Sequence, residues 1–252
     1  MTAEPALAVI GGSGLYELPG LERVVEREVT TPYGAPSDRL CEGRLAGRRV
    51  LFLARHGARH TLLPGEINAR ANLWALKDAG ATRVISVSAV GSLRDAIAPG
   101  DAVIVRQLLD LTRGRPGTFF GDGVVAHVSL ADPVCDDLAA ALGVAAARRL
   151  RVHDPAVYAC IEGPRFSTRA ESRMLRDLGA DVVGMTGAPE AALAREAELC
   201  YASLALPTDY DCWRAPGDEV RVPDVLAQLR SNVAAALEVL ADALAALTPD
   251  AP

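Results

Sequence analysis

Apolar and β-branched residues gather in short runs along the chain, each bounded by polar residues, glycine or proline. Runs of this length predict buried strands rather than helices, because helices in globular proteins are usually longer. The predicted strands are 7–10, 50–54, 83–88, 102–105, 156–161 and 200–206. The first helical pattern, with apolar residues every three or four positions, begins only after the second of these runs.

Helical spacing of the apolar residues fills several intervals between the strands and most of the C-terminal region. The predicted helices are 68–79, 133–150, 168–178, 189–199 and 223–247. Thr168 and Glu171 form a capping-box pattern, and Gly80 and Gly179 stand where helices commonly end. The last helix carries one stripe of leucine and valine, which favours packing on the core over binding of a partner.

The alternation of strands and helices predicts an α/β fold with helices around a largely parallel sheet. A chain of 252 residues, half of them apolar, can build one large core, and no linker-like segment divides it. We therefore expect a single domain over 1–252. Ligands of such folds bind at the carboxyl ends of the strands, so the loops that follow strands are the first candidates for a site.

Charge and cysteine content narrow the functional class. The formal net charge of -6 argues against a nucleic-acid-binding protein, since those carry a basic face. The five cysteines are scattered, with no C-x-x-C pair and no metal-binding spacing, which predicts reduced thiols and no metal site. The opening residues MTAEPALAVIGG resemble neither a secretory signal nor a membrane anchor. A cytoplasmic protein acting on small molecules is expected.

Three predicted strands end in residues suited to an anion. These are Gly11 to Gly14 with Ser13, then Arg55 with His56, then the stretch from Ser86 to Ser92. Each alone is equally well explained by a tight turn or a surface ion pair. Glu17 breaks the dinucleotide pattern G-x-G-x-x-G, and Leu15 breaks the G-x-S-x-G nucleophile elbow. Together, the three strand ends favour a phosphate site.

Two carboxylates follow the strand 200–206. Asp209 and Asp211 are two residues apart, so on an extended segment they face the same side. Like charges near a buried strand end raise the pKa of one of them, which suits a general acid that protonates a leaving group. The commoner alternative is an Asx-turn with solvated carboxylates.

A family resemblance rests on nine segments that occur in the same order along nearly the whole chain. They are IGGSGL, TPYGAPS, ARHGARHT, NARANLWALKDAG, AVGSL, PGD, EGPRFSTRAES, MTGAPEAALAREAELCYASLAL and TDYDCW. In these segments the chain closely resembles the methylthioadenosine phosphorylase branch of the nucleoside phosphorylase family. The resemblance implies a mixed, barrel-like sheet flanked by helices, assembled as a homotrimer.

The resemblance also implies roles for individual residues. The implied phosphate site is Ser13, Arg55, His56, Ser88, Ala89 and Thr186; the base and ribose pocket is Phe166 and Met185; the methylthio pocket is Val222 and Val225. Asp209 and Asp211 are the implied base-recognition pair, with Asp209 as general acid. The resemblance implies that His127 contributes to the site of a neighbouring subunit.

The implied reaction is cleavage of 5′-methylthioadenosine by inorganic phosphate, without metal or cofactor, in purine and methionine salvage. One alternative is a phosphorylase of 6-oxopurine nucleosides, which is supported by Gly184 where adenine-specific members carry asparagine. Another is a nucleoside-binding protein without catalysis. The stretch 214–221 could close over the base or serve as a simple connector.

Overall fold

The computed structural model describes residues 4–214 and 221–247, and within them the chain builds one α/β domain. The strands are β1 Ala6–Gly11, β2 Glu22–Arg27, β3 Leu40–Leu45, β4 Arg48–Ala54, β5 Ala81–Ser92, β6 Ala102–Leu111, β7 Val152–Ile161, β8 Val182–Gly184 and β9 Cys200–Asp209. The helices are α1 Ala69–Asp78, α2 Asp136–Ala146, α3 Arg169–Asp177, α4 Gly187–Glu196 and α5 Val222–Ala246.

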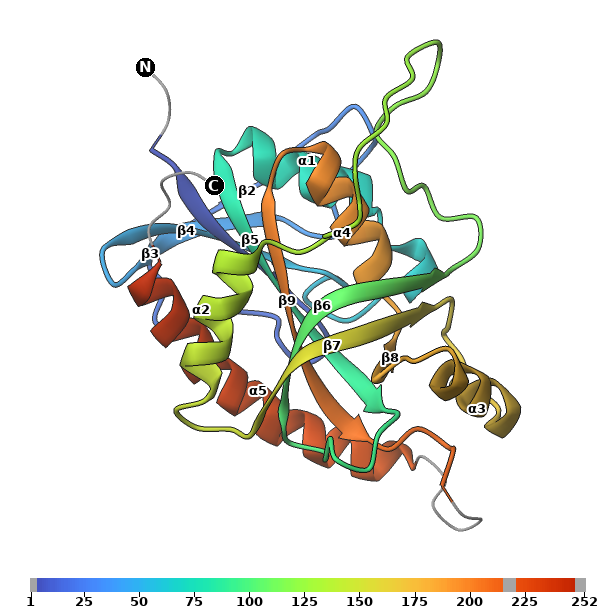
Figure 1. Cartoon of the computed structure of the whole chain (residues 1–252). Helices are drawn as coiled ribbons and strands as arrows, with labels where there is room; N and C mark the ends of the chain where they lie inside the picture. The colour runs from blue at the N-terminus through green and yellow to red at the C-terminus, as the bar shows by residue number, and fades with distance from the viewer. Residues whose placement is uncertain (1–3, 215–220, 248–252) are drawn as a thin grey trace.

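The strands form one mixed sheet in the order β2-β3-β4-β1-β5-β8-β7-β6-β9. β9 pairs with β6 on one side and with β5 on the other, so the strands from β5 to β9 close into a barrel (Figure 1). α2 packs against α5 on one side of the barrel, and α1 against α4 on the other. The α/β class agrees with the prediction from the sequence pattern, and the barrel-like mixed sheet flanked by helices is the architecture that the family resemblance implied.

All six predicted strands and five predicted helices are present, with shifted ends. Thr168 Oγ1 accepts from the backbone N–H of Glu171, whose carboxylate accepts from the N–H of Thr168, so the predicted capping box begins α3. Gly80 and Gly179 end α1 and α3 with φ of 91° and 89°, a conformation that glycine adopts without strain. The helix predicted over 133–150 is shorter, because α2 begins at Asp136 and ends at Ala146.

The apolar core lies inside the barrel and beneath the helices. Every residue of β1 is buried, as expected for a strand with parallel neighbours on both sides and helices over both faces. The larger cluster of buried side chains joins the strands to α2 and α5, and a second cluster joins them to α1 and α4. These packed layers hold the strand ends in fixed positions around the site.

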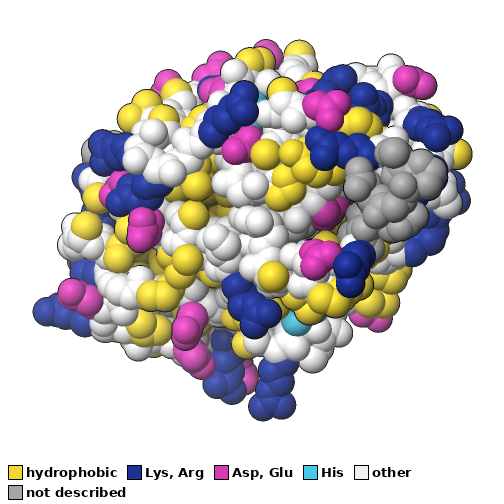
Figure 2. All heavy atoms as spheres, turned by 90° about the horizontal axis from the view of Figure 1, so that it is seen from below, with side chains coloured by type: hydrophobic (Ala, Val, Ile, Leu, Met, Phe, Trp, Pro, Cys, Tyr) yellow, Lys and Arg dark blue, Asp and Glu magenta, His cyan; other side chains and the backbone are white. Residues whose placement is uncertain are grey.

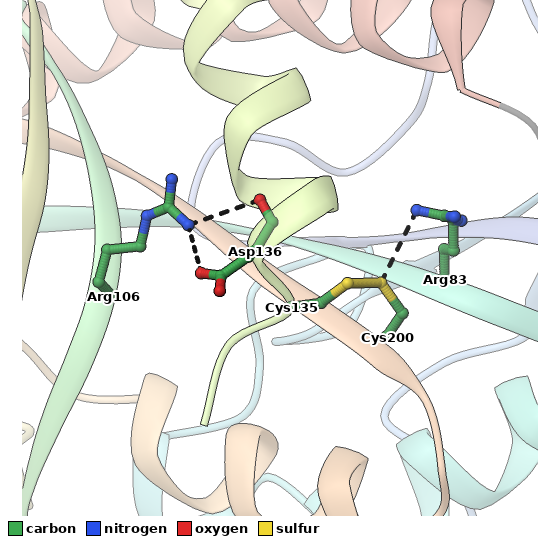
Figure 3. The surroundings of a disulfide bond; sticks show 5 residues. All are labelled: Arg83, Arg106, Cys135, Asp136 and Cys200. Carbon is green, nitrogen blue, oxygen red and sulfur yellow. Dashed lines mark hydrogen bonds and ion pairs between the residues drawn. A yellow bond between two sulfur atoms is a disulfide. The ribbon is translucent and has the colours of Figure 1, made fainter. Parts of the chain in front are cut away.

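The prediction that all cysteines are reduced is wrong for two of them. Cys135, which precedes α2, forms a disulfide with Cys200 at the start of β9 (Figure 3). The two residues are 65 positions apart, and nothing in their spacing indicated that the fold brings their Cα atoms to 5.2 Å. Cys41, Cys160 and Cys212 are free thiols.

The surface agrees with the sequence charge. On the face shown in Figure 2, Lys and Arg are interspersed with Asp and Glu rather than gathered into one positive field. Within the described ranges no helix is long and apolar enough to cross a membrane.

Candidate active site

A cavity of about 580 Å³ opens where several strands end. Its wall comes from the C-terminal part of β5 and from the segments that follow β1, β4, β7, β8 and β9, together with the first turns of α5. Twelve of the residues singled out in the sequence line it: Ser13, Arg55, His56, Ser88, Ala89, Phe166, Met185, Thr186, Asp209, Asp211, Val222 and Val225. The expected convergence of separate strand ends is therefore present.

Gly12 allows the loop after β1 to approach the other strand ends closely. A Cβ at this position would overlap the carbonyl oxygen of Val87 in β5 and would lie 2.8 Å from Arg55 Nη1. Only glycine fits between these two groups. The loop consequently places Ser13 against the cavity next to the arginine.

Arg55 is held differently from the expectation. Its planar Nε and Nη2 edge is bound by both carboxylate oxygens of Glu190 in α4, and Nη2 also donates to Ser86 Oγ at 2.6 Å. Nη1 donates to Val87 O at 2.8 Å. The guanidinium is 1% exposed, so its fork is not free for a phosphate. One Nη1 hydrogen, beside Gly12, is left for an anion.

The ring of His56 has a defined tautomer. Nδ1 lies 2.9 Å from the carbonyl oxygen of Leu62, and since a carbonyl only accepts, Nδ1 carries the proton. Burial, with a smaller effect of the nearby Arg55 charge, lowers the pKa of His56 to about 4, although the hydrogen bond to Leu62 opposes the shift. A neutral His56 therefore offers Nε2 as an acceptor for a proton-bearing oxygen.

Hydroxyl groups complete the polar end of the cavity. Ser88 in β5 and Thr186 at the start of α4 are both buried, and their hydroxyl oxygens lie 3.4 Å apart. Thr186 is the N-cap of α4, but its side chain makes no capping hydrogen bond. Both hydroxyls can thus donate to an oxyanion, beside a helix N-terminus that favours negative charge.

Asp209 is the last residue of β9 and lines the same cavity. One carboxylate oxygen accepts from the Thr208 hydroxyl at 2.7 Å, and the other accepts from the backbone N–H of Asp211 at 2.8 Å. Burial raises the pKa of Asp209, and these two hydrogen bonds counter only part of the rise. A carboxyl group with a raised pKa is suited to hold and deliver a proton.

Asp211 is the more unusual carboxylate, with a φ of 51° and 4% exposure. Burial raises the pKa of Asp211, and Ser172 and Ser167 lower it in part. Its Oδ2 atom makes no hydrogen bond of good geometry to a described residue, although the hydroxyls of Ser167 and Ser172 lie near enough to lower the pKa. A buried acceptor without a donor is costly, so this oxygen is placed for a ligand N–H or O–H.

Comparison with known proteins identifies the family. The model of the phosphorylase superfamily matches residues 6–245. The chain belongs to the phosphorylase superfamily. It is 53% identical to the S-methyl-5′-thioadenosine phosphorylase of Geobacter sulfurreducens, over 96% of this chain and 85% of that protein. It is 50% identical to the protein of the same name from Hyperthermus butylicus, over 97% and 89%.

Solved structures agree with this assignment. Methylthioadenosine phosphorylase from Schistosoma mansoni in complex with adenine matches with a TM-score of 0.92 and 40% identity, over 96% of this chain and 91% of that one. A methylthioadenosine phosphorylase from an Antarctic soil metagenomic library matches with a TM-score of 0.91 and 47% identity, over 96% and 86%.

The remaining candidates of this phosphorylase differ in their surroundings. Val222 and Val225, in the first turns of α5, border the cavity with Leu226 and Leu229 and form its apolar wall.

His127 does not line the cavity. It lies on the segment 112–135, which we call the arm, and which rises away from the barrel (Figure 1). Most of the loop 214–221 lies outside the described residues.

Sequence reasoning missed several residues of this phosphorylase site. Glu190 and Tyr201 form the buried support of Arg55, with the Tyr201 hydroxyl donating to Glu190 Oε2 at 3.1 Å. A glutamate within the alanine-rich helix 189–199 was the one available signal, because a charge on a buried helix face needs a partner. His60 stacks on His56, and its ring hydrogen-bonds the Tyr16 hydroxyl. His60 and Tyr16 both line the cavity.

Proposed function

We propose that this phosphorylase is a pentosyltransferase that cleaves 5′-methylthioadenosine with inorganic phosphate, giving adenine and 5-methylthioribose 1-phosphate. The observation that carries the proposal is the pair Asp209 and Asp211 in one cavity with the hydroxyls of Ser13, Ser88 and Thr186. Phosphorolysis of a nucleoside needs donors that hold phosphate and an acid that protonates the leaving base. The hydroxyl groups supply the first, and the two carboxyl groups of raised pKa supply the second. The names of the relatives support the same substrate.

Phosphate is the nucleophile. The hydroxyls of Ser13, Ser88 and Thr186, with the free Nη1 hydrogen of Arg55, hold its oxygens, and neutral His56 accepts from a protonated one. Holding the nucleophile near the anomeric carbon removes most of the entropic cost of bringing two reactants together. An oxygen of phosphate forms the new bond to the anomeric carbon as the bond from that carbon to purine N9 breaks.

The electron pair of the broken bond goes to the purine. Protonated Asp209 delivers its proton to N7, so the base leaves neutral, and proton transfer of this kind contributes about 10²- to 10⁴-fold. Asp211 Oδ2 accepts from the exocyclic 6-amino group. A 6-oxo group would present lone pairs to that oxygen and leave both acceptors unpaired, so the site favours adenine.

The 6-oxopurine alternative rested on Gly184. A side chain at position 184 would point at the buried ring of Tyr158, which does not line the cavity, rather than at the base. Gly184 therefore does not by itself favour an oxo group. The apolar wall of Val222 and Val225 accepts a methylthio group at lower cost than a hydroxyl.

Release of free base tests the proposal. Purified protein is mixed with methylthioadenosine, methylthioinosine, adenosine or inosine, with and without phosphate, and the bases are separated by chromatography. Phosphate-dependent adenine from methylthioadenosine is expected as the fastest reaction. Hypoxanthine alone would move the protein to 6-oxopurine substrates, and no release from any nucleoside would favour binding without catalysis.

The assembly belongs to the same proposal. The arm exposes Phe120, Val124, Val125, Val128 and Leu130 to solvent, and apolar patches of this kind usually meet another protein surface. We propose a homotrimer in which the arm carries His127 to a neighbouring site. Light scattering after gel filtration should give the trimer mass, and a monomer that is fully active would contradict the role of His127.

We also propose a cytoplasmic location. The sugar 1-phosphate product is charged and does not cross membranes unaided, so its use requires an enzyme in the same compartment. The Cys135–Cys200 disulfide is the feature that argues the other way, because disulfides are rare in reducing compartments. Cell fractionation would decide between the two.

A further inference from the structure

The segment 184–187, between β8 and α4, brings Gly184, Met185 and Thr186 to the cavity wall. The Thr186 hydroxyl faces Ser88 Oγ and caps no helix N–H, so its direction depends on what fixes the backbone of this segment. A small shift of the segment would move the hydroxyl out of reach of an anion. The groups that hold the segment therefore matter to phosphate binding.

Two buried side chains hold it from behind. Arg115, which is bound by Glu162, donates from Nη1 to the carbonyl oxygen of Met185 at 2.6 Å. The hydroxyl oxygen of Tyr158 in β7 accepts from the backbone N–H of Thr186 at 3.3 Å. The tyrosine hydroxyl thus fixes the backbone of Thr186 directly.

Tyr158 is a fixed, neutral group. Its side chain is 0% exposed, and burial raises its pKa well above the ordinary value, so it keeps its proton at any working pH. Since Tyr158 does not line the cavity, it touches neither nucleoside nor phosphate directly. Any effect on the reaction has to pass through Thr186.

Gly184 makes room for this tyrosine. A Cβ at Gly184 would overlap the Tyr158 hydroxyl oxygen and lie 2.6 Å from Cζ of the ring. Tyr158 and a side chain at position 184 therefore exclude each other. Position 184 is therefore glycine because the ring of Tyr158 fills the space that a side chain there would need.

From these contacts we infer that Tyr158 is a positioning residue of the phosphate site, which acts by fixing Thr186, and that Gly184 is glycine because Tyr158 occupies the room of its side chain. The inference rests on the proposed function for the identity of the anion. It assigns to the pair a role in phosphate affinity rather than in base choice.

Tyr158→Phe removes the hydroxyl and keeps the ring. The dissociation constant of inorganic phosphate, measured by calorimetry without nucleoside, should rise about 3- to 10-fold, the effect of losing one ordinary hydrogen bond. The KM for phosphate should rise by the same factor, with the KM for nucleoside unchanged. Tyr33→Phe is the matched control, because it removes a tyrosine hydroxyl that bonds the carbonyl of Phe119 and Tyr33 does not line this cavity.

Each result has a distinct meaning. Equal changes in both KM values, or a lower Tm with unchanged phosphate affinity, would show that Tyr158 is merely structural and overturn the inference. No phosphate binding by the unchanged protein would instead overturn the proposed function. The two failures are therefore distinguishable.

A double substitution tests whether side chains at positions 158 and 184 compete for the same space. Gly184→Ala alone should lower the Tm and weaken phosphate binding. The fall in Tm of the double variant, Gly184→Ala with Tyr158→Leu, should be smaller than the sum of the falls of the two single variants. The reason is that the smaller side chain at position 158 leaves space for the new methyl group. If Gly184→Ala is equally harmful in both backgrounds, the two side chains do not compete and the inference fails.

Discussion

At the scale of single residues, the chemistry depends on which carboxylate carries a proton. Burial is the largest cause of the raised pKa of Asp209, so the proton that leaves with the purine belongs to a group that is hard to ionise. Asp209→Asn keeps the shape and an N–H donor but cannot transfer a proton. Its kcat should fall about 10²- to 10⁴-fold.

The pH profile checks the same role. In the unchanged enzyme, kcat should fall as the pH rises through the pKa of Asp209, since only the protonated acid works. The slow residual rate of Asp209→Asn should be flat over this range. A variant that keeps the falling limb would show that another group supplies the proton.

Asp211 separates base choice from proton transfer. Its Oδ2 atom makes no well-formed hydrogen bond within the described residues, and an unmet buried acceptor costs about 1–3 kcal/mol. Asp211→Asn replaces that acceptor with an amide that can turn its N–H toward a 6-oxo group. The ratio of kcat/KM for methylthioadenosine to that for methylthioinosine should fall about 10-fold or more. An unchanged ratio would mean that Asp211 does not face position 6.

At the scale of elements, the position of the loop that follows β1 depends on Gly12. Gly12→Ala should raise the KM for phosphate about 10-fold or more, because a methyl group would push the loop off Val87 and Arg55. Initial rates at varied phosphate measure it. Gly117→Ala is the control, because its Cβ would meet nothing within 4 Å. Equal effects at both glycines would contradict the steric argument.

The elements also show what periodicity can and cannot predict. β1, β4 and β9 are buried runs and were predicted, whereas β2, with all six residues exposed, and β8, with only three residues, carry no apolar pattern. β8 nevertheless delivers Met185 and Thr186 to the site. Those two residues came from the family resemblance, because a three-residue strand gives no periodicity signal.

The fold brings together residues whose partnership no local pattern reveals. Arg55 and Glu190 are 135 positions apart, and their pairing follows from α4 packing beside the end of β4. The sequence therefore predicted that Arg55 lies at the site but not that a carboxylate already binds its fork. The same limit applies to Tyr158 beneath Gly184, since neither residue type alone predicts the contact.

At the scale of the whole molecule, the Cys135–Cys200 disulfide links the end of the arm to the first residue of β9. A crosslink across 65 residues restricts the unfolded chain, and loops of this size contribute about 2–4 kcal/mol to the free energy of unfolding. Asp209 lies at the other end of β9, about 30 Å along the strand, so the chemistry should not depend on the crosslink.

Cys200→Ser should therefore lower the urea midpoint while leaving kcat and both KM values unchanged. Cys41→Ser, which removes a free thiol, is the control for the loss of a cysteine as such. Adding dithiothreitol should lower the midpoint of the unchanged protein and leave that of Cys200→Ser where it was. If the reductant moves both proteins equally, the difference does not come from the crosslink. A fall in kcat would instead mean that the start of β9 is coupled to Asp209 through the strand.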